Sequence, residues 1–175
     1  MKFIELAKER YSVRSYLPRK IEDEKLQLIL EAGRVAPTAC NNQPQRVLVI
    51  QSEEGLAKIG ETAPSKMFRA PCVIVVCADR TKTWVRPNDG MNSADIDASI
   101  VTDHMMLQAQ ELGIGSVWIC YFDSQKIKQE FNLPEGVEPI NVLALGYTDE
   151  TPQSSERHAT RRKNLSETVF YESFN

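Results

Sequence analysis

The sequence predicts a single α+β or α/β domain in which roughly four strands lie among five or six helices. Apolar residues recur at helical spacing in several segments, whereas residues 72–78 form a continuous apolar run typical of a strand covered on both faces. The chain has 175 residues, enough for one domain with a sizeable core rather than two. No internal repeat or low-complexity segment divides it, and the pattern leaves the order of the strands open.

The first two helices are predicted from apolar spacing. Phe3, Leu6 and Ala7 indicate a short helix at the start, and a second helix is expected from about Glu22 to Val35. Pro37 ends the second helix, because the residue before a proline is disfavoured in the helical region. One face of that helix carries Leu26, Ile29, Leu30 and Gly33.

The next part of the chain is predicted to contain two strands. Val47–Gln51 is a short strand candidate, and a small helix over Glu53–Ile59 follows it. The apolar run Cys72–Ala78 is the expected buried strand. Residues Asp79–Asn92 contain proline, asparagine, glycine and charges, so a loop is expected there.

A long helix is expected to begin at Ser93, a suitable N-cap, and to end at Gly113, because glycine permits the left-handed cap. Its apolar residues lie on more than one side: Ile96, Ile100, Met105, Leu107 and Leu112. Such a helix is expected to be central in the domain or to lie at a subunit interface.

Two further strands are expected in the last third of the chain. Gly115–Cys120 and Ile140–Gly146 are the predicted strands, and Asp123 is expected to cap a helix that runs to Asn132 between them. After Tyr147 the sequence is polar and lacks convincing periodicity.

Composition and charge are typical of a soluble globular protein, with 42% hydrophobic and 26% charged residues. A net charge of -3 gives no overall attraction to nucleic acid or to anionic membranes. No apolar run approaches the roughly 18–20 residues of a membrane-spanning helix, and the first residues lack the apolar core of a signal peptide. We therefore expect a cytoplasmic protein with neither a nucleic-acid nor a membrane partner.

The cysteines do not form a metal-binding pattern. They include no C-x-x-C pair, and His104 and His158 are distant from them in sequence, so no metal site is expected. Buried, reduced thiols are the expected state of all four: Cys40, Cys72, Cys77 and Cys120. The five-residue separation of Cys72 and Cys77 would place them on opposite faces of a strand.

The first candidate site is the segment RYSVRSY after the opening helix. If it is extended, alternate residues point the same way, so Arg10, Ser12 and Arg14 would converge on one ligand. Guanidinium groups donate hydrogen bonds in a planar fork that suits phosphate and carbonyl oxygens. The alternative is an exposed basic stretch, which the dipole at a helix C-terminus favours.

A second candidate is the turn Ala36–Pro44 between a helix and a strand. Thr38, Asn41 and Gln43, with neighbouring backbone amides, could hydrogen-bond a heterocycle that has alternating donors and acceptors. The alternative is an ordinary connecting loop, because asparagine and proline are common in turns for local reasons.

The segment GIGSVWI, Gly113–Ile119, is a third candidate. Its Gly-x-Gly follows a helix and precedes a strand, the reverse of the dinucleotide-binding order, so it is not a Rossmann fingerprint. The glycines are expected to let the backbone pass close to something flat. Trp118 and Ile119 could then cover one side of an aromatic ring system, with core packing as the alternative.

The tail RHATRRK, Arg157–Lys163, carries positive charges without an acid in an otherwise acidic protein. A solvated surface arm and a phosphate contact are both compatible with this run. No Ser/His/Asp set, paired-carboxylate signature or phosphate-binding loop is present, so hydrolysis and phosphoryl transfer have no candidate residues.

Taken together and in this order, these segments resemble the nitroreductase family of flavin enzymes over nearly the whole chain. The resemblance rests on the following segments: R-x-S-x-R at Arg10–Arg14, (S/T)-A-x-N-x-Q-P at Thr38–Pro44, LGIGSVWI at Leu112–Ile119, LGY-x-x-x-x-P at Leu145–Pro152, and the basic residues Arg161–Lys163 before Leu165. It implies an α+β fold, with a central, mainly antiparallel sheet flanked by helices, and an intertwined homodimer with two FMN sites at the interface. Residues 1–175 would form one FMN-binding domain, with 148–175 as a C-terminal arm.

The resemblance also implies which residues contact FMN. Arg10, Ser12 and Arg14 would hold its phosphate, ribityl chain and pyrimidine edge, and Lys66 matches a family lysine near the pyrimidine. The same flavin would be approached from the other subunit by the turn residues Thr38, Ala39 and Asn41, with Pro37 and Gln43 beside them.

Further contacts are implied for the third candidate segment and for the tail. Trp118 and Ile119 would line one face of the flavin ring, and the backbone amide of Cys120 would lie near flavin N5. Arg162, or alternatively Arg161, would contact the phosphate from the tail.

The chain departs from the family pattern at two places. Gln45 follows Gln-Pro where the family often has an aromatic residue, and Cys120-Tyr121 stands where Gly-Ala or Glu-Gly is frequent. Bulky Tyr121 is expected to narrow the pocket above the flavin, which bears on the substrate range. A chain of this length is also expected to lack a substrate-covering insertion.

By this resemblance, the chain is expected to be an enzyme in which FMN carries the chemistry and no side chain is catalytic. NAD(P)H would be the transient reductant, and nitroaromatic, quinone or related small molecules would be the acceptors in a ping-pong cycle. Arg14 and Lys66 would favour the anionic reduced flavin. If each residue contributes about 1.4 kcal/mol, each would raise the two-electron potential of the flavin by roughly 30 mV.

Two other functions stay open at this point. One is a specialised flavin reaction on the same fold, such as dehalogenation, enone reduction or flavin breakdown. The other is a non-catalytic, flavin-binding sensory module. The identity of the acceptor, the choice between NADH and NADPH and the role of the cysteines also stay open.

Overall fold

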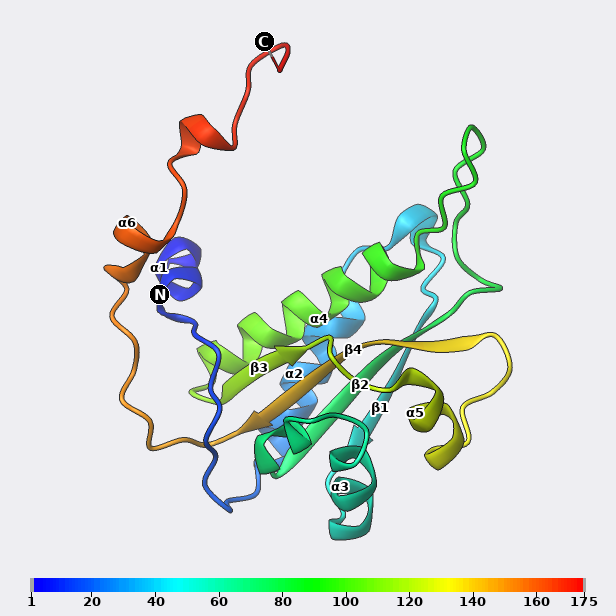
Figure 1. Cartoon of the computed structure of the whole chain (residues 1–175), viewed down its shortest axis with the longest axis vertical. Helices are drawn as coiled ribbons and strands as arrows, with labels where there is room; N and C mark the ends of the chain where they lie inside the picture. Colours follow the sequence, from blue (N-terminus) through cyan, green and yellow to red (C-terminus); the bar gives the residue numbers. More distant parts are fainter. Residues whose placement is uncertain (1, 175) are drawn as a thin grey trace.

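A computed structural model describes residues 2–174 and contains a four-stranded sheet (Figure 1). The strands are β1 (Gln45–Ile50), β2 (Cys72–Asp79), β3 (Gly115–Ile119) and β4 (Val137–Gly146), in the order β1-β2-β4-β3. Every neighbouring pair is antiparallel. The α+β class and the antiparallel sheet are therefore confirmed.

Helices cover both faces of this sheet. The helices α2 (Asp23–Val35) and α4 (Ala94–Glu111) lie on one face, and α3 (Glu53–Gly60) and α5 (Ser124–Glu130) lie on the other (Figure 1). Each of these helices was predicted with nearly the same bounds. None of the helices found between residues 2 and 174 combines the length and the apolar character needed to cross a membrane.

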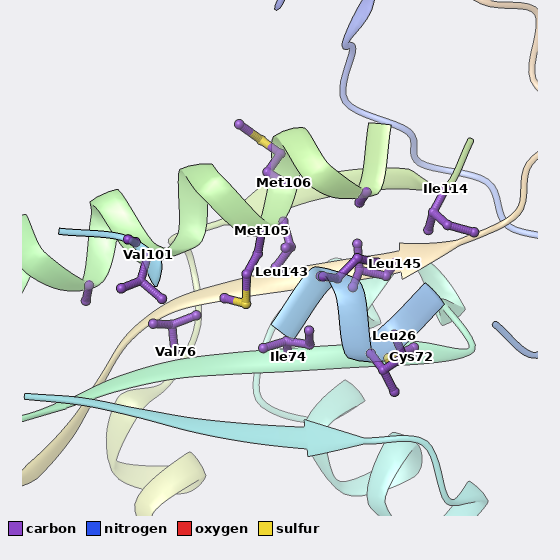
Figure 2. Close-up of a cluster of buried hydrophobic side chains, with 14 of the residues drawn as sticks. Leu26, Cys72, Ile74, Val76, Val101, Met105, Met106, Ile114, Leu143 and Leu145 are labelled. Atoms are coloured by element: carbon purple, nitrogen blue, oxygen red, sulfur yellow. The ribbon is translucent and has the colours of Figure 1, made fainter. Parts of the chain in front are cut away.

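Strand β2 is buried on both faces, as its apolar run predicted. Cys72, Ile74 and Val76 pack against the layer of α2 and α4, in the cluster shown in Figure 2. The intervening residues Val73 and Val75 belong to the cluster beneath α3 and α5. The sheet therefore separates two apolar cores, and β2 contributes to both.

The four cysteines divide into two classes. Cys72 and Cys77 are buried on opposite faces of β2 as predicted, and burial raises the pKa of each thiol to about 12. Cys40 and Cys120 are exposed, so the prediction of a buried thiol is wrong for these two. Cys40 lies in a turn, and Cys120 follows β3, an edge strand of the sheet.

Helix α4 is central, one of the two positions predicted for it. Val101 and Met105 are fully buried between α4 and the sheet (Figure 2). The helix ends with the predicted glycine cap: Gly113 has a φ of +72°, and the N–H of Ile114 donates to the carbonyl oxygen of Ala109 at 2.8 Å.

Strand β4 begins earlier than predicted, at Val137 instead of Ile140. Pro139 concealed this start, because proline cannot donate a ladder hydrogen bond and is rare inside sheets. A shift in the pairing with β2 accommodates it and leaves Ile140 as the extra residue of a β-bulge. After the bulge, Asn141 lies on the α4 side of the sheet and bonds to that helix.

The segment after α1 (Phe3–Glu9) runs beside β3 and crosses the end of β4. The N–H of Val13 donates to the carbonyl oxygen of Ser116 at 2.9 Å, and the Tyr16 hydroxyl donates to that of Ala144 at 3.1 Å. Gly115 permits the crossing, because a Cβ there would lie 2.8 Å from Cγ2 of Val13. The close neighbour of this glycine is thus the chain's own N-terminal segment, which corrects the expectation of a flat ligand.

We expect Gly115→Ala to lower the free energy of unfolding by about 1–3 kcal/mol, the usual effect of overpacking a filled site. Urea unfolding followed by circular dichroism measures the change. Gly60→Ala is the matched control, because the nearest atom to its added Cβ would be 3.8 Å away, in ordinary contact. Equal stability of Gly115→Ala and the wild type would contradict the close approach.

The chain after β4 returns to the N-terminal helix. The short helix α6 (Arg157–Arg161), which was not predicted, lies beside α1 (Figure 1), and Nε2 of His158 is 3.0 Å from the carbonyl oxygen of Lys8. Beyond α6 the chain extends away from the sheet (Figure 1). Its exposed apolar side chains are Leu165, Val169, Phe170, Tyr171 and Phe174.

Candidate active site

Arg10 lies at the end of α1, half-buried among other cations. Burial lowers the pKa of its guanidinium, the positive charges of Arg157 and Arg162 lower it further, and Asp103 acts in the opposite direction. A bound anion would offset this repulsion, and a phosphate offers several oxygens to guanidinium donors. The structure therefore brings the N-terminal segment and the basic tail together, as the phosphate prediction requires.

Arg157 joins these two segments. Its Nη2 donates to the carbonyl oxygen of Arg10 at 2.6 Å, and its Nη1 donates to that of Ser154 at 2.8 Å. Both bonds fix the guanidinium to the backbone, so Arg157 holds the tail in place beside Arg10. Sequence analysis missed this role, because a bond between residues 147 positions apart leaves no local signal.

Arg14 lies at the other end of the R-x-S-x-R segment. Its Cζ is 6.0 Å from the centre of the Phe68 ring. Its backbone N–H donates to Oε1 of Glu150 at 3.0 Å, and its side-chain Nη1 donates to the carbonyl oxygen of Ser12 at 3.2 Å. Arg10 and Arg14 thus have different neighbours, and their convergence on one ligand stays a prediction. Two separate cationic regions suit an elongated ligand with an anionic end.

Lys66 is the first residue of a left-handed turn, which also contains Phe68, whose ring lies under Arg14. Positive φ angles between 47° and 54° are shared by four successive residues: Lys66, Met67, Phe68 and Arg69. Such a conformation costs roughly 1–2 kcal/mol per residue and tends to occur at functional sites. Met67 is almost fully buried and holds the turn, whereas Lys66 is exposed with its Nζ 3.5 Å from Oε1 of Glu61.

The turn after α2 is stabilised mainly by bonds within itself. Oγ1 of Thr38 accepts the N–H of Gln43 at 3.1 Å, and Nε2 of Gln43 donates to the carbonyl oxygen of Asn41 at 3.3 Å. Cys40, Asn41 and Gln43 have positive φ angles, which bend the chain tightly. Thr38 and Gln43 therefore support the turn, while Pro37 and Asn41 are exposed on it.

Asp97, near the start of α4, anchors this turn. Its role was not predicted from the sequence. Asp97 is 1% exposed; its Oδ1 accepts the N–H of Ala39 at 2.8 Å and its Oδ2 accepts the Ser93 hydroxyl at 2.8 Å. Ser93 therefore occupies the predicted N-cap position without capping the helix, and Asn92 accepts the N–H of Ala94 instead. The sequence signal that could have identified Asp97 is an acidic residue four positions after Ser93, on a helix face that is mostly apolar.

We expect Asp97→Ala to lower the free energy of unfolding by about 1–3 kcal/mol, because the Ala39 N–H and the Ser93 hydroxyl would lose their acceptor. Asp97→Asn keeps one acceptor oxygen and should be milder. Asp95→Ala is the control, since this exposed acid pairs with Arg80 at 2.9 Å and surface pairs contribute little. Urea titration of the three variants compares them, and an Asp97→Ala protein as stable as Asp95→Ala would contradict the anchor.

The end of β3 places the side chains of Trp118 and Ile119 on opposite faces of the sheet. Trp118 packs against the cluster beneath α4, and its Nε1 donates to Oδ1 of Asn141 at 3.0 Å. Ile119 is buried in the cluster beneath α3 and α5. The prediction that both side chains line one face of a ring is therefore wrong within this chain, because strand neighbours alternate. Cys120 and Tyr121, which follow, are exposed.

Comparison with known proteins identifies relatives of this arrangement. The sequence matches the model of the nitroreductase family over residues 7–67 and 61–147. The crystal structure of a nitroreductase family protein from Clostridium difficile 630 is 53% identical, with a TM-score of 0.96, and the match covers 99% of this chain and 100% of that one.

Two further relatives carry more specific names. A Methanothermobacter thermautotrophicus protein, provisionally named an NADH dehydrogenase/NAD(P)H nitroreductase, is 32% identical over 163 residues, which cover 87% of this chain and 80% of that protein. The structure of an FMN-dependent nitroreductase from Clostridium difficile R20291 is 27% identical with a TM-score of 0.80, covering 98% of this chain and 99% of that one.

Proposed function

The chain belongs to the nitroreductase family, and from this membership we propose that it is an FMN-dependent oxidoreductase that takes electrons from NAD(P)H. It passes them to nitroaromatic, quinone or related small-molecule acceptors in a ping-pong cycle. The observation that carries this proposal is the junction of the basic tail with the N-terminal segment, where Arg157 bonds to the carbonyl oxygen of Arg10, while Arg14 lies at the other end of that segment. The name of the FMN-dependent relative supports the choice of cofactor.

The donor set of the site fits FMN. Arg10 and Arg162, with Arg161 as the alternative, would bind the phosphate, whose negative charge offsets the repulsion between these cations. Ser12 would serve the ribityl chain, and Arg14 the pyrimidine edge. Bound FMN would supply the chemistry of hydride transfer from NAD(P)H and of electron transfer to the acceptor.

The protein's other site residues would bind and orient the cofactor. Lys66 joins Arg14 in stabilising negative charge at the pyrimidine edge. The amide of Cys120 would lie near flavin N5, with Trp118 and the backbone of Ile119 beside the ring. The partner subunit would contribute the turn residues Pro37, Thr38, Ala39, Asn41 and Gln43. No side chain is assigned a catalytic proton transfer, and water would supply the protons.

We propose that each chain is one domain, that two chains form a homodimer, and that the part of the arm beyond α6 wraps the neighbour. A groove of about 560 Å³ between α1, α2 and α4 supports the dimer. Its apolar lining includes Phe3 and Val35, which are 69% and 60% exposed. Exposed apolar surface gathered in this way is typical of an interaction site. A partner subunit would also bury the exposed apolar residues of the arm.

The cofactor is tested by loading the purified protein with FMN and measuring the bound flavin after acid release. About one FMN per chain is expected if each chain supplies one set of phosphate contacts. Riboflavin is the matched ligand, and it should bind more weakly because it lacks the phosphate. A protein that cannot be reconstituted with FMN would overturn the proposal.

The electron donor and acceptor are tested on the FMN-loaded protein. Anaerobic stopped-flow mixing with NADH or NADPH should bleach the flavin, a nitroaromatic or quinone should restore its colour, and double-reciprocal plots should be parallel. Cys40→Ser and Cys120→Ser should retain turnover, because the proposed chemistry needs no thiol. FMN binding without reduction by either nucleotide would instead favour a sensory module, and reduction without turnover on these acceptors would favour a specialised reaction.

A further inference from the structure

Asn141 is a buried polar residue on the apolar face of the sheet beneath α4. It is 3% exposed, and its neighbours on this face, Val76 and Leu143, are fully buried apolar residues. Burial of an amide is tolerated only when its donors and acceptor are hydrogen-bonded. The bulge at Ile140 adjoins Asn141, and bulges often re-aim a side chain next to an active site.

The carboxamide of Asn141 links the end of β3 to α4. Its Oδ1 accepts the Nε1–H of Trp118 at 3.0 Å and lies 3.9 Å from Sγ of Cys120. Its Nδ2 donates to Oγ1 of Thr102 at 3.2 Å and to Oγ of Ser99 at 3.4 Å. The orientation of the amide is fixed, because an indole nitrogen only donates and must therefore face the oxygen.

We propose that Asn141 is a positioning residue of the FMN site, which acts through Trp118 and Cys120. These two residues are separated by one position at the end of β3, so their side chains leave the same face and share one acceptor. The inference rests on the proposed function, which places the Cys120 amide beside flavin N5. The inference goes beyond that function. Asn141 is assigned no contact with the cofactor, and it sets the positions of Trp118 and Cys120, which are assigned such contacts.

The shared acceptor also holds the Cys120 side chain, whose Sγ lies 3.9 Å from Oδ1 of Asn141. A carbonyl oxygen can accept a hydrogen bond from S–H, which keeps the thiol on the same side of the chain as the Trp118 indole. The accessibility of this exposed thiol to a reagent therefore reports whether Asn141 holds Cys120 in place. Asn141→Leu removes the acceptor, whereas Asn141→Asp retains one.

The first test measures this thiol without any flavin, in a Cys40→Ser background in which Cys120 is the exposed cysteine. Asn141→Leu should raise the rate of alkylation by iodoacetamide at a fixed pH about threefold, because the thiol is no longer held against the amide oxygen. Asn141→Asp should not accelerate the reaction, and Asn88→Leu, the same change in an exposed loop, should leave it unchanged. Mass spectrometry checks that the buried Cys72 and Cys77 stay unmodified, which shows that each variant is folded.

The second test is a double-mutant cycle on the dissociation constant for FMN. Asn141→Leu and Trp118→Phe should each weaken FMN binding about threefold. The double variant should bind FMN no more weakly than the weaker of the two single variants, because both substitutions remove the same hydrogen bond. Effects that multiply, or alkylation rates that are identical in the wild type and Asn141→Leu, would overturn the proposal. If the wild type binds no FMN, the proposed function fails, while the alkylation rates still decide the role of Asn141.

Discussion

Combining Arg10→Ala with Arg162→Ala is expected to weaken FMN binding at least a hundredfold. A hydrogen bond to a charged group contributes roughly 1.5–3 kcal/mol, so each lost guanidinium should weaken binding tenfold or more. Both changes act on the phosphate, so the affinity for riboflavin should change far less. Quenching of flavin fluorescence, measured at constant ionic strength, gives both dissociation constants, and added salt should reduce the difference between the variants.

Arg161→Ala provides the matched control for this experiment. Arg161 precedes Arg162 in the chain and is exposed, so its removal changes the net charge equally without removing the proposed contact. A larger effect for Arg161→Ala than for Arg162→Ala would transfer the tail contact to Arg161. A double variant that binds FMN as tightly as the wild type would contradict the phosphate site itself.

Mixing two inactive variants should restore FMN binding and activity in half of the sites of each heterodimer. One variant carries Arg14→Ala, and the other carries Thr38→Ala with Asn41→Ala. If each site combines Arg14 of one chain with the turn of its partner, one site of the heterodimer receives both lesions and the other receives none. Differently tagged chains allow the heterodimer to be purified after subunit exchange, and bound FMN and turnover are then counted per dimer.

Each parent homodimer is the baseline for this measurement, because all of its sites carry one lesion. A heterodimer of wild type with the Arg14→Ala chain is the matched control, and it should also show half of the sites intact. Verified mixed heterodimers that recover no FMN would exclude shared sites. Sedimentation of the wild type as a monomer with full FMN occupancy would exclude them as well.

The elements that depend on near neighbours in the chain were predictable. The apolar run of β2 and the glycine cap at Gly113 are encoded within a few residues, and both are confirmed. Pro139 concealed the start of β4, because the bulge that accommodates it depends on pairing with a strand far earlier in the chain. The strand order β1-β2-β4-β3 likewise depends on long-range pairing, which spacing alone does not encode.

The site was predictable by residue type more than by arrangement. Burial and the charges of Arg157 and Arg162 lower the pKa of Arg10, and its contact with a phosphate stays a prediction. Asp97, Arg157 and Asn141 were missed, because each acts through a hydrogen bond to a distant segment and belongs to no local motif.

The crossing of the sheet by the N-terminal segment also determines when the site can exist during protein synthesis. The N–H of Val13 bonds to Ser116, and the N–H of Leu17 bonds to Tyr147. A ribosome adds roughly 5–20 residues per second, so the partner of Leu17 is made on the order of ten seconds after Leu17 itself. The N-terminal segment must therefore wait for β4 and Tyr147 before it can settle across the sheet. A nascent chain that stops before β4 lacks the partners of Tyr16 and Leu17, so the proposed FMN site would form only after β4 has been made.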